Sequence, residues 1–272
     1  LTVKANKRTF IFSKKDGQLK GVSVDNRKIN FANGPRFIGA RRADRSLDQF
    51  YNHDDEKAKE KDRTYSEFPD AAVFTKLDVK QDGGDLIVTA NYKLGNLDKA
   101  QWTINPSGDL ALDYTYNFSG VVDLMGIRFD YPEDQVISKR WLGAGPYRVW
   151  QNRIHGTQYD IWENDYNDPI PGETFTYPEF KGYFGDVSWM NIQTKEGTIS
   201  LTNETPDAYI GVYQPRDGRD RLLYTLPESG ISVLNVIPPV RNKVNSTDLC
   251  GPSSQPKWVN GPQTGRVIFR FM

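Results

Sequence analysis

The chain has 272 residues, of which 37% are hydrophobic and 12% aromatic, and its 35 basic side chains equal its 35 acidic ones. This balance gives no general electrostatic attraction to nucleic acid or to an acidic membrane, and no apolar run approaches the roughly 18 residues of a membrane span, so neither partner is expected. One cysteine, Cys250, and two histidines leave no intrachain disulfide and too few ligands for the usual zinc cages, so we predict no metal or other cofactor. The length suits one large domain that spans residues 1–272.

The first half of the sequence is rich in β-strand patterns. Apolar and polar residues alternate over Thr9 to Val24 on either side of a Lys15-Asp16-Gly17 turn, which predicts a β-hairpin. Alternation returns from Phe74 to Phe118, with turn signals at Asp82 to Asp85 and at Pro106 to Gly108. Strands at this spacing, with no helical period between them, predict an antiparallel sandwich and exclude a barrel of alternating strands and helices.

Two charged stretches interrupt the strand patterns. Gln49 to Asp62 has no apolar face and is predicted to be a solvated loop, in which His53 is an exposed side chain rather than a metal ligand. Glu163 to Asp168 is a local acidic run, but it lacks the complete residue pattern of a calcium loop. We expect a solvated turn there.

The stretch from Lys139 to Met190 concentrates the large planar side chains and holds four of the six tryptophans of the chain. Its aromatic residues lie among asparagine, aspartate, glutamine and arginine side chains. A sugar has C–H faces that stack on aromatic rings and hydroxyl edges that bond to planar polar groups, so the stretch is a candidate carbohydrate site. For any single ring, burial in the core of the β domain is the competing interpretation.

Strand patterns resume after Trp189 and end in a closing strand over residues 265–271. The strands expected in between cover residues 197–203, 208–215, 222–227 and 230–238. Before the closing strand, Cys250 to Trp258 is rich in proline, serine and glutamine and is predicted to be a loop. A tryptophan in such a loop is equally compatible with functional exposure and with burial.

Several short motifs, taken in order, resemble the C-terminal small-chain domain of family 2 β-galactosidases. They are the hairpin at Asp16-Gly17, the Gly34-Pro35 step, the strand from Leu124 to Phe129, the Trp141-Leu142-Gly143-Ala144-Gly145-Pro146 motif and the Asp186-Val187-Ser188-Trp189 motif. Where the family's first motif continues with glutamate, tyrosine and aspartate, this chain has Arg148, Trp150 and Asn152. The resemblance covers nearly the whole chain.

The resemblance implies an all-β fold, a large antiparallel two-sheet supersandwich similar to galactose mutarotases. It also implies the C-terminal part of a longer glycoside hydrolase that is periplasmic or extracellular. In the family, the loop before the last strand carries an aromatic platform to the sugar site of a catalytic barrel, and Trp258 is the matching residue. The expected partners are therefore a carbohydrate, such as a galactoside or a related glycan, and the barrel of the same parent chain. The other residues expected to bind the sugar or to shape the sandwich and its concave rim are Trp141, Tyr147, Trp150, Arg153 and His155.

Two other hypotheses stay open. A free-standing aldose epimerase on the same scaffold needs an acid and a base on opposite sides of the sugar ring, and His155 is the candidate acid, without a glutamate partner marked by the sequence. A purely structural domain would only stabilise a homo-oligomer. Glycoside hydrolysis by this chain alone is not predicted, because the spacing of its carboxylates singles out no catalytic pair.

Overall fold

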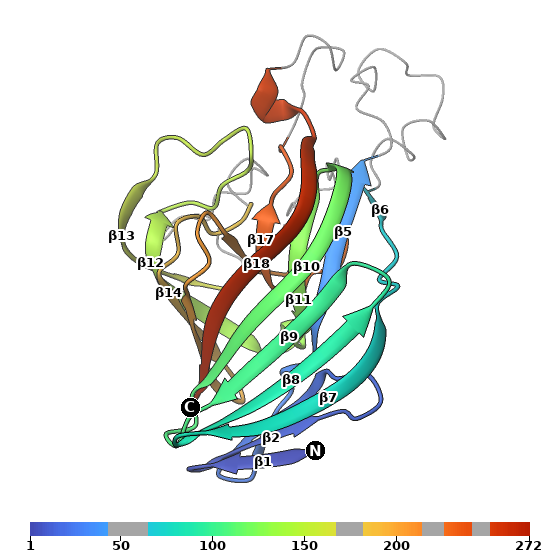
Figure 1. The fold of residues 1–272 in the computed structure, drawn as a ribbon. Helices are drawn as coiled ribbons and strands as arrows, with labels where there is room; N and C mark the ends of the chain where they lie inside the picture. Colours follow the sequence, from blue (N-terminus) through green and yellow to red (C-terminus); the bar gives the residue numbers. More distant parts are fainter. Residues whose placement is uncertain (43–64, 167–181, 214–225, 241–250) are drawn as a thin grey trace.

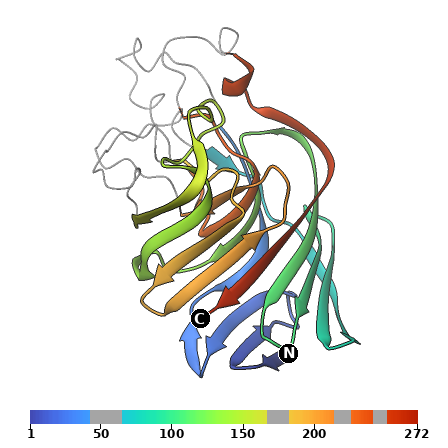
Figure 2. The same cartoon turned by 90° about the vertical axis from the view of Figure 1, so that its left-hand side faces the viewer.

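Two antiparallel sheets make up the part of the chain that the structure, a computed structural model, describes: residues 1–42, 65–166, 182–213, 226–240 and 251–272 (Figures 1 and 2). The first sheet has the strand order β1-β2-β3-β5-β11-β17-β16, with β4 beside β3 and β6 beside β5. The second sheet has the order β13-β12-β14-β15-β18-β10-β9-β8-β7. All pairings between these strands are antiparallel, so the predicted all-β, two-sheet fold is confirmed.

The strands of the first sheet are β1 (Thr2–Ala5), β2 (Arg8–Phe12), β3 (Leu19–Val24), β4 (Arg27–Ile29), β5 (Ala32–Arg42), β6 (Tyr65–Glu67), β11 (Leu124–Asp130), β16 (Tyr209–Val212) and β17 (Ile231–Val236). Those of the second sheet are β7 (Val73–Asp82), β8 (Asp85–Lys93), β9 (Leu97–Ile104), β10 (Leu110–Val122), β12 (Val136–Gly145), β13 (Gln158–Asp165), β14 (Trp189–Thr194), β15 (Gly197–Asn203) and β18 (Lys257–Phe271). Two short 3-10 helices, η2 (Glu133–Gln135) and η5 (Pro252–Ser254), precede β12 and β18. No helix among the described residues is long and apolar enough to cross a membrane.

The hairpins predicted from turn residues are present. β2 and β3 pair on either side of the Lys15-Asp16-Gly17 turn, where Gly17 has a φ of +73° that few other residues adopt without strain. β7 and β8 pair around Gly83 and Gly84, and β9 and β10 pair around Pro106 to Gly108. Local turn chemistry therefore sets the register of these strand pairs.

The main core lies between the two sheets and is rich in aromatic rings. On β10 the even-numbered residues from Leu110 to Tyr116 point inward and are buried, as strand alternation requires. Trp102 of β9 meets Phe129 of β11 edge to face, with ring centroids 6.1 Å apart, and Phe31 stacks on Phe129 at 4.8 Å. The contact between Trp102 and Phe129 joins the two sheets, so both are needed to bury the apolar faces of either one.

A second, smaller core covers one end of the outer face of the first sheet. Even-numbered residues of β5 and β11 point away from the main core, yet Ile38, Ala40 and Leu124 are buried. They share this cluster with Trp150 and Tyr183, which come from the connection after β12 and from the segment before β14. The aromatic stretch of the sequence therefore folds back onto the first sheet at this end.

Two sequence predictions of local structure are wrong. The closing strand β18 begins at Lys257 rather than near residue 265, because the earlier residues continue to pair with β10, from Lys257 opposite Val122 onward. The acidic run predicted as a turn is strand up to Asp165, which pairs with Ser138 of β12. Side-chain charge does not prevent pairing at an exposed sheet edge, where carboxylates stay solvated.

Some predictions fall outside the described residues. These are the solvated loop from Gln49 to Asp62 with His53, the end of the acidic run after Tyr166, most of the strand expected over residues 222–227, and Cys250.

Candidate functional site

Trp258 lies at the start of β18, and its side chain is exposed on the outer face of the second sheet. It is 71% exposed and pairs with Val121 of β10. Two residues further on, Asn260 lies opposite Ser119, whose Oγ donates a hydrogen bond to the Asn260 Oδ1 at 2.8 Å. Because alternate residues of a strand share a face, the exposed indole and this polar pair lie on one surface. We call Trp258, Asn260 and Ser119 the Trp258 surface.

The chain just before Trp258 is fastened to the connection after β12. The Gln151 side chain is buried, and its Nε2 donates to the carbonyl oxygens of Ser253 at 2.8 Å and Gln255 at 2.7 Å. The backbone N–H of Gln151 donates to the carbonyl of Pro238 at 3.0 Å. One side chain thus clamps η5 and the following residues at the upper end of β18 in Figure 1.

Three of the predicted residues lie at the surface of the connection after β12. Arg153 and His155 are exposed, and Tyr147 is half-buried, with its hydroxyl donating to the carbonyl of His155 at 3.3 Å. The backbones of Arg153 and Trp150 bond to each other and close a tight turn. The His155 imidazole makes no hydrogen bond or ion pair with the described residues, so its role as an epimerase acid stays a prediction.

The other two predicted tryptophans are buried. Trp141 is fully enclosed, packs edge to face on Phe184 at 4.9 Å, and donates from Nε1 to the carbonyl of Ala144 at 3.1 Å. Trp150 is 3% exposed and packs edge to face on Tyr183 at 5.7 Å. Burial also raises the pKa of Tyr183 above the ordinary tyrosine value, so its phenol stays neutral. Both tryptophans act as packing residues that shape the sandwich, and neither leaves an open ring face for a sugar here.

The family model described as the beta galactosidase small chain matches residues 4–245. The chain belongs to this family. The sequence positions that depart from the family motif lie in the clamped connection: Arg148 is buried with its guanidinium 5.8 Å from the ring centre of Phe184, Trp150 is in the second core, and the Asn152 Oδ1 accepts from the N–H of Val240 at 2.9 Å.

Several solved structures are similar to this chain over its full length. The alpha-N-acetylgalactosaminidase NagBb from Bifidobacterium bifidum, in complex with GalNAc, is 12% identical with a TM-score of 0.47, and the domain covers 36% of that chain. A galactose mutarotase-like protein from Lactobacillus casei is 11% identical with a TM-score of 0.48 and 99% of its chain covered. Galactose 1-epimerase from Lactobacillus acidophilus is 9% identical with a TM-score of 0.47 and 93% covered. No curated protein matches the sequence.

Sequence reasoning missed one feature of the small-chain domain, a cavity of about 780 Å³ on the outer face of the first sheet. Its lining includes Arg36 of β5, Arg128 and Asp130 of β11, and Lys20 of β3. These residues are far apart in sequence, and two strand pairings bring them together: β5 with β11, which sets Arg36 opposite Arg128, and β3 with β5. Among the described residues, no three His, Cys, Asp or Glu side chains gather as metal ligands would.

Proposed function

We propose that this chain is an accessory domain of a larger glycoside hydrolase and that Trp258 serves as the stacking platform for a carbohydrate. The partners in this proposal are a galactoside or related glycan and a catalytic barrel in the same parent chain, working in the periplasm or outside the cell. Membership of the beta galactosidase small-chain family supports the accessory role.

The observation that carries the proposal is the exposure of Trp258. A large apolar ring that is 71% exposed gains free energy when a ligand or partner covers it. Its backbone is held by strand pairing with Val121, so the ring's base is already ordered before binding. The pair Ser119 and Asn260 supplies hydrogen-bonding groups beside the indole, which suits a sugar ring with an apolar face and polar edges.

A calorimetric titration of the 272-residue chain with galactose, lactose and galacturonate tests the proposal. We expect weak binding that Trp258→Ala reduces at least about tenfold and Trp258→Phe reduces less, because a stacked aromatic contact contributes roughly 1 kcal/mol beyond its buried area. The melting temperature of both variants should match that of the parent chain. No binding at tens of millimolar sugar, or equal affinity in the alanine variant, would overturn the sugar-platform role and leave a structural domain.

A further inference from the structure

The outer-face cavity of the first sheet has the dimensions of a small-molecule site. Its volume of about 780 Å³ falls within the roughly 300 to 1,000 Å³ of typical ligand pockets. Its lining comes from β3, β4, β5 and β11, from the segments that precede β12 and β17, and from Tyr213 directly after β16. The lining includes Ala32 at the start of β5, whereas Trp258 lies near the start of β18. Figure 1 shows these two strand starts at opposite ends of the fold. We call it the β5–β11 cavity.

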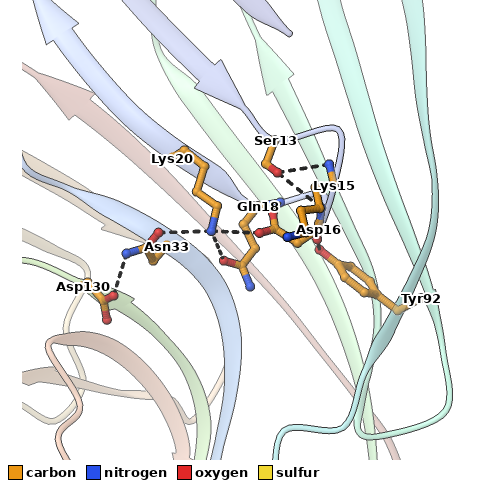
Figure 3. A network of polar contacts seen from close by, with 8 residues as sticks. All are labelled: Ser13, Lys15, Asp16, Gln18, Lys20, Asn33, Tyr92 and Asp130. Atoms are coloured by element: carbon orange, nitrogen blue, oxygen red, sulfur yellow. Dashed lines mark hydrogen bonds and ion pairs between the residues drawn. The ribbon is translucent and has the colours of Figure 1, made fainter.

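A chain of polar contacts holds an open carboxylate in this cavity. The Asp130 Oδ1 accepts from Arg36, and its Oδ2 accepts from the Asn33 Nδ2 at 2.9 Å. Asn33 is fixed in turn by the Lys20 Nζ, which donates to the Asn33 Oδ1 at 3.1 Å and pairs with the Asp16 carboxylate at 2.9 Å (Figure 3). The Asp130 side chain nevertheless stays 49% exposed. A carboxylate with a fixed orientation and open lone pairs is prepared to accept hydroxyl groups.

The cavity wall also contains hydrogen-bonding groups that the described chain does not use. The hydroxyls of Tyr213 and Ser229, side chains that are 8% and 2% exposed, have no hydrogen-bond partner there. The Nε atoms of Arg36 and Arg128 have none either. A buried polar group without a partner costs about 1 to 3 kcal/mol, so such groups are rare in folded proteins and call for an explanation.

The charges of the cavity identify the class of ligand. Three of the four cations in the wall are ion-paired: Arg36 with Asp130, Arg128 with Glu67 at 3.4 Å, and Lys20 with Asp16. The charge of the fourth cation, Lys28, is offset by the carboxylates of Glu133 and Glu228 in the lining. The wall therefore has no surplus of positive charge to attract phosphate or carboxylate. The guanidinium groups of the wall donate hydrogen bonds and its carboxylates accept them, and the rings of Tyr131 and Tyr213 lie beside them. This combination matches a neutral ligand whose neighbouring hydroxyl groups both donate and accept.

We propose that the β5–β11 cavity is a second binding site for a neutral saccharide, anchored on Asp130 and bordered by Tyr213. The site does not depend on the Trp258 surface. Its presence would give the domain two separate contacts with one long glycan or with two chains of a polymer, and linked contacts raise the overall affinity without new interactions.

The test uses the 272-residue chain carrying Trp258→Ala, so that heat from the Trp258 surface cannot be mistaken for this site. Galactose, glucose and lactose are titrated, with glucuronate as an anionic comparison. We expect a neutral saccharide to bind, Asp130→Asn to weaken it about tenfold or more, and Tyr213→Phe to weaken it about fivefold, as hydrogen bonds to charged and to neutral groups respectively would.

Tyr213→Phe is the matched control for a structural role. Its hydroxyl bonds to nothing in the described chain, so a purely structural tyrosine would lose no stability on this change, and the melting temperature should stay the same or rise. Loss of affinity at unchanged melting temperature supports the site. Absence of saccharide binding, affinity that neither variant alters, or tighter binding of glucuronate than of glucose would overturn the proposal. These outcomes are independent of whether Trp258 binds sugar.

Discussion

The outer face of β5 and β11 has two halves that the protein treats in opposite ways. At one end Ala40 and Leu124 lie opposite each other and are sealed beneath Trp150 and the second core. Four residues further along the same strands, Arg36 lies opposite Arg128 and faces a cavity. The same pair of strands thus has one half of its outer face buried and the other half open. The side chains decide this difference: the apolar half is covered and the charged half stays accessible.

A glycine, Gly126, lies at the boundary between the two halves. Gly126 lies opposite Ile38, between the apolar and the charged pairs. A Cβ built on Gly126 would lie 2.1 Å from the carbonyl oxygen of Val233 on the neighbouring strand β17. Only glycine allows β17 to approach β11 this closely.

The largest expected effect concerns the covered half. Trp150→Ala should lower the free energy of unfolding by about 3 to 5 kcal/mol, because it removes a buried indole and leaves a void in the second core. Urea denaturation followed by far-ultraviolet circular dichroism measures this change. Trp258→Ala is the matched control: the same substitution at a side chain that is 71% exposed should cost less than about 0.5 kcal/mol. Equal costs at the two positions would contradict the division between packing and surface tryptophans.

An intermediate loss of stability is expected when the hydrogen bonds between Gln151 and the segment before β18 are removed. Gln151→Leu keeps the size of the side chain but removes the donors to Ser253 and Gln255, which should cost about 1 to 3 kcal/mol. Amide hydrogen exchange should rise in residues 251–256 and stay unchanged in β9, since the clamp does not reach the main core. Unaltered exchange in residues 251–256 would show that other contacts position this segment.

The smallest change in stability is expected in the polar network of the open half, at Asp16. Burial acts to raise the pKa of Asp16, but hydrogen bonds from Lys20, the Gln18 N–H and Ser13, with the charge of Lys20, outweigh it and lower the pKa. A lowered folded-state pKa stabilises the protein above the unfolded-state pKa, about 3.9, and this stabilisation is lost as the pH falls through the folded-state value. Asp16→Asn should therefore destabilise the chain at pH 7 and have almost no effect near about pH 2.

The size of that difference is limited by solvent. The Asp16 side chain is 38% exposed, so screening holds the cost at pH 7 to about 0.5 kcal/mol. Thermal unfolding of both proteins between pH 2 and pH 7 measures it. Asp25→Asn is the control, because Asp25 also pairs with a lysine, Lys7, but its side chain is 61% exposed. A cost that stays constant across this pH range would mean that the carboxylate charge plays no part.

The sequence predicted the structural features that depend on residues close together in the chain. The turn at Gly17 and the alternation along β10 gave the hairpins and the inward face of that strand, because both are local properties. It left open whether Trp258 is exposed, since a residue's burial depends on what lies across from it, and it placed the start of β18 too late because Gly261 and Pro262 are turn-formers that here pair with β10.

The candidate sites show the same limit. The sequence suggested that Trp141 and Trp150 bind sugar, but Trp141 is buried in the main core between the sheets and Trp150 in the second core. The β5–β11 cavity was hardly detectable in the sequence, because Lys20, Arg36 and Asp130 lie in separate segments and converge only when β3, β5 and β11 pair. The one available hint was that Arg36 occupies the same strand face as Ile38 and Ala40, a break in an otherwise apolar face.

β18 has a consequence for the order in which the molecule is assembled. This strand lies in the middle of the second sheet, between β10 and β15, although it is the last strand in sequence order. A ribosome therefore releases the β7 to β10 group and the β12 to β15 group well before the strand that joins them. Until then each group presents an unpaired edge, and pairing of Leu110 with Phe269 must close a very long loop. We expect slow folding with a late, cooperative step in which β18 zips the two groups into one sheet.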